Sequence, residues 1–249
     1  MMTFRLPLLV PVVVGLLLFV MAPVTADESG NGAVDGLPMF AATYELRRNN
    51  LRAAELSRSL SCEDNVCEFR SRGQTVGLAD LVLRGRINEW TRFRLDDNGG
   101  LVPQEYHYRQ EARGDNNEFR RLFFYPEEER VTSRGDDTWE KSIAGETMDE
   151  LLSQLRLLLA VRAGETEMTF SVVDDDGEVD EYHFEVTGRE TIDTGEGSLE
   201  TIRVERVGGS SKRRTRMWFA PDLEYVPVKV QHERIDRETY TATLTSLER

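Results

Sequence analysis

The chain has 249 residues and carries 31 Lys and Arg against 45 Asp and Glu, a formal net charge of −14 at pH 7. Because nucleic acid and anionic membrane surfaces are themselves negatively charged, a chain this acidic should be repelled by both, which argues against a nucleic-acid partner. The length is sufficient for a sizeable core and for one or two domains.

The first 26 residues have the organisation of a secretory signal peptide. Arg5 precedes an apolar run over 6–22, and the small residues of Val24-Thr25-Ala26 form a cleavage site, so we predict cleavage between Ala26 and Asp27. An uncleaved membrane anchor is the alternative, because the run is close to spanning length. After cleavage we expect a periplasmic protein with no stable membrane insertion. Its first residues, 27–39, are rich in Gly, Asp, Ser and Asn and are predicted to be a disordered leader.

The two cysteines, Cys62 and Cys67, flank the turn-like sequence Glu63-Asp64-Asn65-Val66. Export to an oxidising compartment favours a disulfide between them. Such a bond would close a hairpin and contribute about 2 kcal/mol in the chain-entropy model. A redox or metal-binding pair is the alternative, but the spacing is not CxxC and no second pair of ligands accompanies it.

From residue 40 onwards, short runs of β-branched and aromatic residues alternate with Gly, Asn, Asp and Pro, which indicates β-strands. We predict strands over 41–47, 53–61, 67–75, 87–95, 104–110, 119–125, 130–133, 138–141, 168–173, 179–187, 199–207, 212–219, 225–234 and 238–247. Strands at this spacing predict a mostly β fold, a curved antiparallel sheet that forms an open or half-closed barrel.

One segment, 147–163, is predicted to be a helix. Its apolar residues recur at helical spacing: Met148, Leu151, Leu152, Leu155, Leu158 and Leu159. Thr147 and Glu150 are suited to a capping box at its start, and Gly164 can adopt the left-handed conformation that ends a helix. We expect this single amphipathic helix to pack against the sheet, so that 40–249 forms one domain.

No constellation typical of catalysis is found. His107, His183 and His232 lie in separate predicted strands, and although zinc could gather them, none has a helical partner at the spacing of known zinc motifs. His183 shares its face with Glu181 and Glu185, which indicates a solvated face. There is also no GxSxG motif and no glycine-rich phosphate loop. We therefore predict a non-enzymatic protein with no catalytic residue, no metal and no cofactor.

Three charged segments have two interpretations each. DDNG at 96–99 and DDDG at 174–177 resemble fragments of calcium loops, but both lack the bidentate Glu of such loops, so turns are favoured. The basic cluster 212–216 is either a patch for an anionic ligand or the solvent face of a strand, and we favour the second interpretation.

Aromatic residues offer the best candidates for a binding site. An apolar cavity between helix and sheet could be lined by Tyr106, Tyr108, Trp139, Trp218, Leu151, Leu155 and Leu158. The alternative is that these side chains simply fill the core.

Several segments together carry a family resemblance. They are LVPQEY at 101–106, the helix with Asp149, Ser153 and Arg156, WFAPD at 218–222 and YVPVKV at 225–230. In this order, after a signal peptide, they resemble the uncharacterised bacterial family called domain of unknown function 3108. The resemblance implies an exported Gram-negative protein, mostly β, without an assigned activity. A looser, fold-level similarity is to the periplasmic lipoprotein carriers, whose curved sheet holds acyl chains beneath a helical lid.

The leading hypothesis is a protein that binds an apolar small molecule, such as a lipid acyl chain, or a client polypeptide in a groove between sheet and helix. The alternative is an assembly or interaction factor of the cell envelope, with a filled core and an envelope protein as its partner. If side chains fill the space between Leu155 and the sheet aromatics, this alternative is favoured. An envelope hydrolase is the least favoured, since no catalytic group is evident.

Overall fold

The computed structural model describes residues 36–114, 117–208, 213–234 and 238–249. The predicted signal peptide, its cleavage site and residues 27–35 of the predicted leader lie outside this part. Leu37 and Met39 pack against the core, so the prediction of disorder does not hold for residues 36–39. None of the helices in the described ranges has both the length and the apolar character needed to cross a bilayer.

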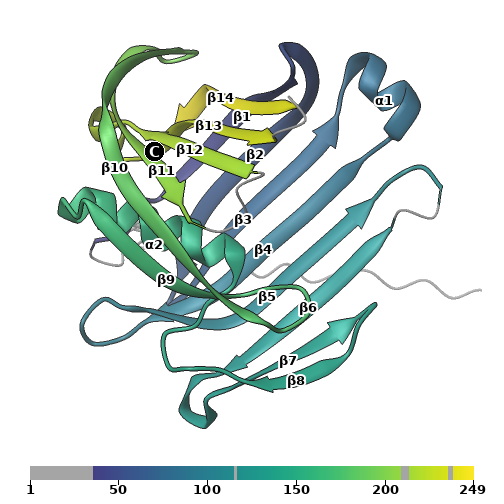
Figure 1. Cartoon of the computed structure of the whole chain (residues 1–249), viewed down its shortest axis with the longest axis vertical. Coiled ribbons are helices and arrows are strands. Elements are labelled where there is room, and N and C mark those ends of the chain that lie inside the picture. The colour runs from purple at the N-terminus through teal and green to yellow at the C-terminus, as the bar shows by residue number, and fades with distance from the viewer. Residues whose placement is uncertain (1–35, 115–116, 209–212, 235–237) are drawn as a thin grey trace, which may run out of the picture. The chain divides into compact units, whose positions relative to one another are not determined.

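One antiparallel sheet of 14 strands dominates the described residues (Figure 1). Its strands are β1 Phe40–Arg48, β2 Leu51–Glu63, β3 Val66–Thr75, β4 Arg86–Leu95, β5 Leu101–Glu111, β6 Glu118–Tyr125, β7 Arg130–Gly135, β8 Trp139–Ser142, β9 Glu167–Val173, β10 Val179–Thr194, β11 Gly197–Val207, β12 Arg213–Phe219, β13 Pro227–Arg234 and β14 Thr239–Glu248. Every predicted strand is confirmed. The largest boundary difference is in β10, which continues to Thr194 instead of ending at 187.

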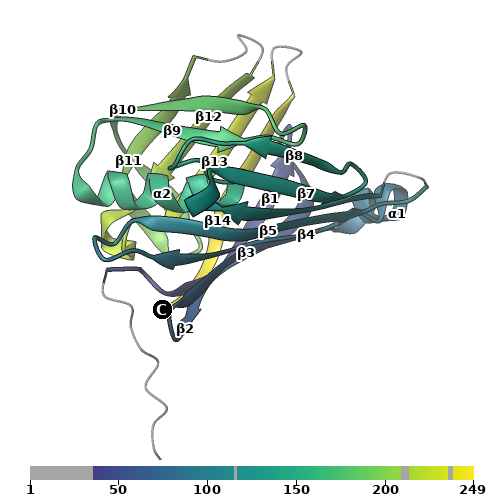
Figure 2. The ribbon, with the colours of Figure 1, turned by 90° about the horizontal axis from the view of Figure 1, so that it is seen from below.

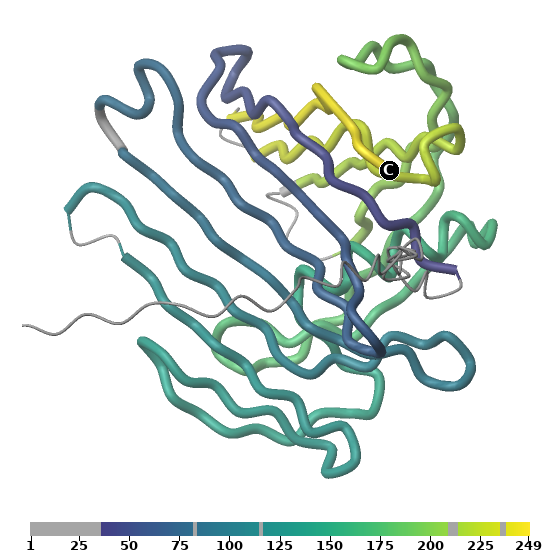
Figure 3. The backbone as a smooth tube through the Cα atoms, turned by 180° about the vertical axis from the view of Figure 1, so that it is seen from behind, coloured from purple at the N-terminus to yellow at the C-terminus, as the bar shows by residue number. Residues whose placement is uncertain are grey.

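The strand order is β8-β7-β6-β5-β4-β3-β2-β1-β14-β13-β12-β11-β10-β9. The first and last strands, β1 and β14, are therefore neighbours in the middle of the sheet, as the tube in Figure 3 shows, and the edges are β8 and β9. The sheet curves strongly without closing, which confirms the predicted open barrel. Cys62 and Cys67 are joined by a disulfide across the β2–β3 hairpin, as predicted.

Helix α2, Glu150–Ala163, connects the two edge strands and lies against the concave face of the sheet (Figures 1 and 2). It contacts β3 and β4 on one side of the sheet and β9 on the other. Inward-facing side chains of both halves pack around its leucines to form one contiguous core. The predicted packing of helix on sheet is confirmed.

The start of α2 differs from the prediction. Its N-cap is Asp149, whose carboxylate accepts a hydrogen bond from the Leu152 amide. Thr147 cannot take this place, because Met148 is paired in parallel with Val172 of β9 and keeps the preceding backbone extended. The predicted capping box of Thr147 and Glu150 is therefore wrong, and the Thr147 hydroxyl is buried without a partner among the described residues.

The end of α2 agrees with the prediction. Gly164 has a φ of 86° and its amide donates to the carbonyl of Val161, 3.1 Å away. A residue with a Cβ adopts this left-handed conformation only at a cost, so glycine is the natural end of the helix.

A second α-helix, α1 (Gly77–Leu83), connects β3 to β4 and was not predicted. It has seven residues and no side-chain cap, so neither of the usual sequence signals marks it. Two single turns of 3₁₀-helix, η1 (Pro126–Glu128) and η2 (Pro221–Leu223), each follow a strand and begin with proline.

The β10–β11 hairpin folds back over the outer face of the sheet. At its tip the Gly195 amide donates to the Leu244 carbonyl of β14, 2.9 Å away. A Cβ at Gly195 would lie 2.0 Å from the Thr245 carbonyl oxygen, so no other residue fits this approach. The extension of β10 thus covers outward-facing side chains of β12 and β13.

Candidate functional site

A cavity of about 520 Å³ lies on the concave face, between the first turns of α2 and strands β10–β13. Arg58 of β2 also lines this cavity, since the sheet curves around α2 (Figure 2). The helix contacts both halves of the sheet, β3 and β4 on one side and β9 on the other. The cavity is lined by Arg58, Glu150, Ser153, Gln154, Asp174, Asp180, Tyr182, Phe184, Arg206, Gly208, Thr215, Met217, Val230 and His232.

Arg58 is the charged residue that β2 contributes. It alternates with Leu56 and Leu60, which pack in the core, so its side chain also points to the concave face. Its Nε atom is buried and has no hydrogen-bond partner among the described residues. A buried donor left without an acceptor costs about 1–3 kcal/mol, which makes this atom a natural contact for an acceptor on a ligand.

The opposite wall is aromatic and apolar. The Arg206 guanidinium lies over the ring of Tyr182, 3.3 Å from its centroid, and the rings of Tyr182 and Phe184 are 6.5 Å apart. Burial raises the pKa of Tyr182, and the Glu150 carboxylate adds to the increase, so this hydroxyl stays protonated. Met217 extends the apolar surface.

Beside the cavity, Glu89 of β4 accepts a hydrogen bond from the hydroxyl of Tyr106 on β5, 2.8 Å away. Burial raises the pKa of Glu89 to about 7; the Tyr106 hydrogen bond and the Arg58 charge oppose this rise, and Glu150 and Asp149 add to it. Burial also raises the pKa of Tyr106. Glu89 can therefore change its charge near neutral pH.

Asp149 links α2 to the sheet. One carboxylate oxygen accepts from the Leu152 amide at 2.8 Å, and the other accepts from the Thr91 hydroxyl of β4 at 2.7 Å. Burial raises the pKa of Asp149 to about 6, although both hydrogen bonds favour the charged form. The start of the helix is thus fixed to β4 by a side chain with a strongly perturbed pKa.

The seven predicted ligand-binding residues are not brought together in one cavity. Tyr106 donates its hydroxyl hydrogen bond to Glu89, beside the cavity. Tyr108 is half-buried and donates to the Gln110 side chain, 3.1 Å away. The Trp139 indole N–H donates to the Asp175 carbonyl in the β9–β10 turn, 3.1 Å away, and so connects the edge strand β8 to the other half of the sheet.

Leu151, Leu155 and Leu158 are fully buried in the core, and Leu155 is only 1% exposed. Trp218 points to the outer face, beneath the β10–β11 hairpin, where its indole N–H donates to Glu190 at 2.8 Å. The ammonium of Lys229 lies 4.5 Å from its ring centroid. None of the seven lines the cavity, and their role in ligand binding stays a prediction.

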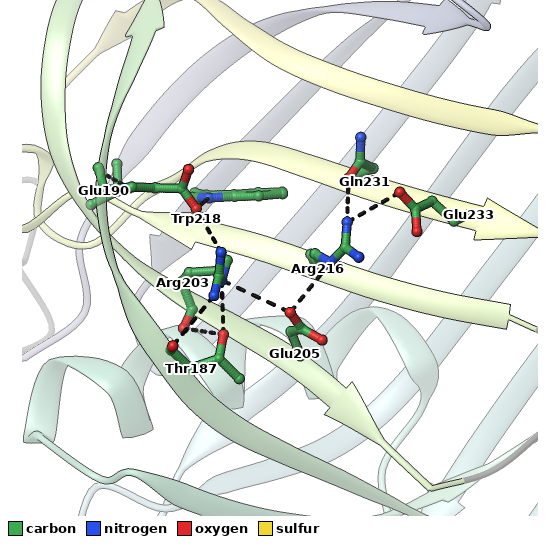
Figure 4. A network of polar contacts seen from close by, with 9 residues as sticks. Thr187, Glu190, Arg203, Glu205, Arg216, Trp218, Gln231 and Glu233 are labelled. Carbon is green, nitrogen blue, oxygen red and sulfur yellow. Dashed lines mark hydrogen bonds and ion pairs between the residues drawn. The ribbon is translucent and has the colours of Figure 1, made fainter. Parts of the chain in front are cut away.

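The basic cluster of β12 belongs to an ion-pair network on the outer face (Figure 4). Arg216 pairs with Glu205 at 3.3 Å and with Glu233 at 3.1 Å. Arg203 pairs with Glu190 at 3.1 Å. Arg216, and by alternation Arg214, therefore lie on the outer face of a strand, as favoured above, whereas Thr215 lines the cavity and Lys212 lies outside the described residues.

The histidines do not converge. His107 stacks on Trp90 on the outer face, with ring centroids 5.1 Å apart. His183 contacts the Thr169 hydroxyl, and His232 lines the cavity. The described ranges contain no group of three His, Cys, Asp or Glu side chains arranged to hold a metal ion.

Both acidic segments are turns in the structure. Asp96 accepts at one carboxylate oxygen from the amides two and four residues later, both at 2.8 Å. Asp174 makes the same pair of bonds at 2.9 Å. Each carboxylate thus stabilises its own turn.

Sequence reasoning missed Arg58, Glu89 and Arg206. Their signal was present: each is a charged residue at an inward position of an alternating strand, such as Arg58 between two core leucines. A charge placed among core positions is costly unless it has a task or a partner.

The comparisons with known proteins agree with this fold. A family model described as "Protein of unknown function (DUF3108)" matches residues 40–245. No curated protein matches the chain. Among solved structures, a β-barrel-like protein of domain of unknown function DUF1849 from Brucella abortus is 12% identical, with a TM-score of 0.53 over 85% of this chain and 98% of that one. This similarity shows a shared fold.

Two further structures are more distant. An exported protein with a YmcC-like fold from Bacteroides fragilis has a TM-score of 0.33 and 11% identity, over 86% of this chain and 97% of that one. A lipoprotein from Parabacteroides distasonis has a TM-score of 0.32 and 11% identity, over 86% and 96%.

Proposed function

The chain belongs to the DUF3108 family, as its sequence motifs indicated, and we propose that it is an exported, non-catalytic binding protein. Its ligand is a small amphipathic molecule held in the cavity beside α2. The polar part of the ligand contacts Arg58 and Arg206, and the apolar part contacts Phe184 and Met217. The periplasm is the proposed location, on the basis of the N-terminal sequence and of a disulfide typical of oxidising compartments.

The observation that carries this proposal is the cavity itself. Its volume of about 520 Å³ falls in the range of small-molecule sites. It combines an apolar wall with several convergent charged groups, which is the composition that orients a ligand. The unpartnered Nε atom of Arg58 supplies a donor that a ligand oxygen would satisfy.

An amphipathic ligand is favoured over the purely apolar one expected from the sequence. The space around Leu155 is occupied by core side chains, so an acyl chain has no room beneath the middle of α2. A wholly apolar ligand in the cavity would also strip water from Arg58, Glu150 and Asp180 without replacing its hydrogen bonds.

The proposal is tested by native mass spectrometry of the protein recovered from the periplasm without detergent, after expression of the full chain. We expect an excess mass that disappears on denaturation. Met217→Trp should reduce this loading because the larger side chain fills the cavity, whereas the control Arg214→Trp, at an exposed position of the same strand, should not. Equal loading of both variants would contradict the site.

Arg58→Met gives a second test. We expect the affinity for the ligand to fall about tenfold, because one charge-assisted hydrogen bond is lost. Stability should be unchanged or higher, because a buried donor without a partner is removed. Arg72→Met, at an exposed position of β3, is the matched control. A stable Arg58→Met variant that still loads fully would remove Arg58 from the site.

The second candidate function is an assembly or interaction factor of the cell envelope. The filled core around Leu155 is the observation that favours it. The same experiment distinguishes the two, since a bare polypeptide mass under gentle native conditions would favour a protein partner.

A further inference from the structure

Helix α1 exposes leucines to an unusual degree. Leu78 is 82% exposed and Leu81 is 67% exposed. Nearby, Leu51 at the start of β2 is 76% exposed. These are the three most exposed large apolar side chains of the described residues, and they lie at one end of the sheet, because the Val76 amide next to α1 donates to the Ala53 carbonyl of β2.

The helix is held in place by its own polar contacts. The Thr75 hydroxyl donates to the Asp80 carboxylate at 2.8 Å, and the Gly85 amide donates back to the Thr75 hydroxyl at 2.9 Å. The Thr75 amide donates to the Gly85 carbonyl, also at 2.9 Å. The segment thus forms a closed projection at one end of the sheet (Figure 1), on which Leu78 and Leu81 are exposed.

Three exposed arginines lie on or next to α1. Arg84 is the C-cap of α1 and Arg86 begins β4. Arg113, in the β5–β6 connection, donates to the Leu81 carbonyl at 3.4 Å. No ion pair joins these arginines to a described carboxylate, whereas most other arginines of the sheet have one. We refer to Leu78, Leu81, Arg84, Arg86 and Arg113 as the α1 tip.

We propose that the α1 tip docks the protein on the surface of an anionic lipid bilayer. The leucines enter the boundary between headgroups and acyl chains, and the arginines contact lipid phosphates. Apolar side chains flanked by cations on a projecting helix have the composition of an interfacial anchor. The net charge of −14 does not prevent this contact, since the field of carboxylates far from α1 is screened within about 8 Å at physiological salt. On α1 itself, Asp80 is the one carboxylate, and it accepts a hydrogen bond from the Thr75 hydroxyl.

Charge also argues against a second copy of the chain as the occupant. A two-fold symmetric contact through the α1 tip would bring the three arginines against the same arginines of the other copy, and Asp80 is the only carboxylate that α1 of each copy offers against them. Lipid phosphates, in contrast, complement all three guanidinium groups.

Vesicle flotation tests the proposal with the full chain expressed and its exported product purified. We expect the wild type to bind vesicles of phosphatidylethanolamine and phosphatidylglycerol. The double variant Leu78→Asp with Leu81→Asp should bind them with an affinity lower by about tenfold or more, because two apolar groups are lost. Val179→Asp, at a position 40% exposed on β10, is the matched control and should bind as the wild type does. No binding by the wild type, or equal loss in the control, would overturn the proposal.

A second measurement reports the depth of the helix and does not depend on any ligand in the cavity. The two native cysteines are joined in the disulfide, so Leu78→Cys creates one site for an environment-sensitive dye. We expect a blue shift of its emission on vesicles and none for dye at Val179→Cys. Arg84→Gln with Arg86→Gln should weaken binding and reduce its salt dependence. If the protein binds the vesicles but the emission of the dye at Leu78→Cys does not shift, docking through α1 is contradicted.

Discussion

The two ends of α2 lie in different surroundings. From Leu155 onwards the buried side chains of the helix pack against inward-facing residues of both halves of the sheet. At the beginning, Glu150, Ser153 and Gln154 line the polar cavity, and Asp149 is bonded to β4. One helix thus has a purely structural end and an end where buried charges are retained.

This difference indicates where functional residues lie in such a fold. Apolar burial explains the core end completely, since each leucine there gains from leaving water. It does not explain Glu89 or Arg58, which burial destabilises in their charged forms. Buried charged groups that lower stability and lie close together are candidates for a functional role, and here they lie near the start of α2.

The strongest test of the core end is Leu155→Ala. We expect a loss of about 2–5 kcal/mol in the free energy of unfolding, because a fully buried leucine leaves a cavity. Leu159→Ala, at a half-buried position of the same helix, should cost clearly less. Urea denaturation measures both. Similar losses for the two variants would mean that α2 packs no more tightly at Leu155 than at its margin.

The polar end should respond to pH. The pKa values of Glu89 and Asp149 are raised to about 7 and about 6, so the folded state holds more protons than the unfolded chain between about pH 4 and 7. The stability from these groups is therefore complete below about pH 4 and is lost as pH rises through 6 and 7. This slope is opposite to that of carboxylates in ion pairs, such as Glu190, whose pKa is lowered.

Glu89→Gln isolates this effect. Relative to the wild type, the variant should gain stability on the order of 3 kcal/mol between about pH 4 and about pH 8, since it has no charge to bury. Denaturation curves of both proteins across this range give the difference. A difference that does not change with pH would show that Glu89 is ionised as easily in the folded protein as in water.

The junction between the two ends depends on Asp149. Asp149→Ala should cost about 2 kcal/mol, because the Leu152 amide loses its cap and the Thr91 hydroxyl loses its acceptor. A double-mutant cycle with Thr91→Val measures the shared part. Thr147→Val is the control: its hydroxyl has no partner in the described structure, so we expect no loss. A larger cost for Thr147→Val than for Asp149→Ala would restore the capping box predicted from sequence.

The sequence determined the strands, the disulfide and the position of α2. Alternation over short runs, such as Met168, Phe170 and Val172, identifies a strand without any knowledge of its partners, because the period of 2 is local. The same holds for the C-terminal Gly164, whose left-handed conformation is a property of one residue. The disulfide followed from two cysteines separated by a turn.

Other features were decided only by the tertiary structure. The N-cap moved from Thr147 to Asp149 because a distant strand, β9, pairs with Met148. Trp218 faces the outer side of the sheet, and it is buried there only because the β10–β11 hairpin covers it. Arg58 and Arg206 line the same cavity because the whole sheet curves and brings their strands, β2 and β11, close together. Local patterns fix which way a side chain points, but the residue that it meets depends on strand order and curvature, which no short segment of sequence contains.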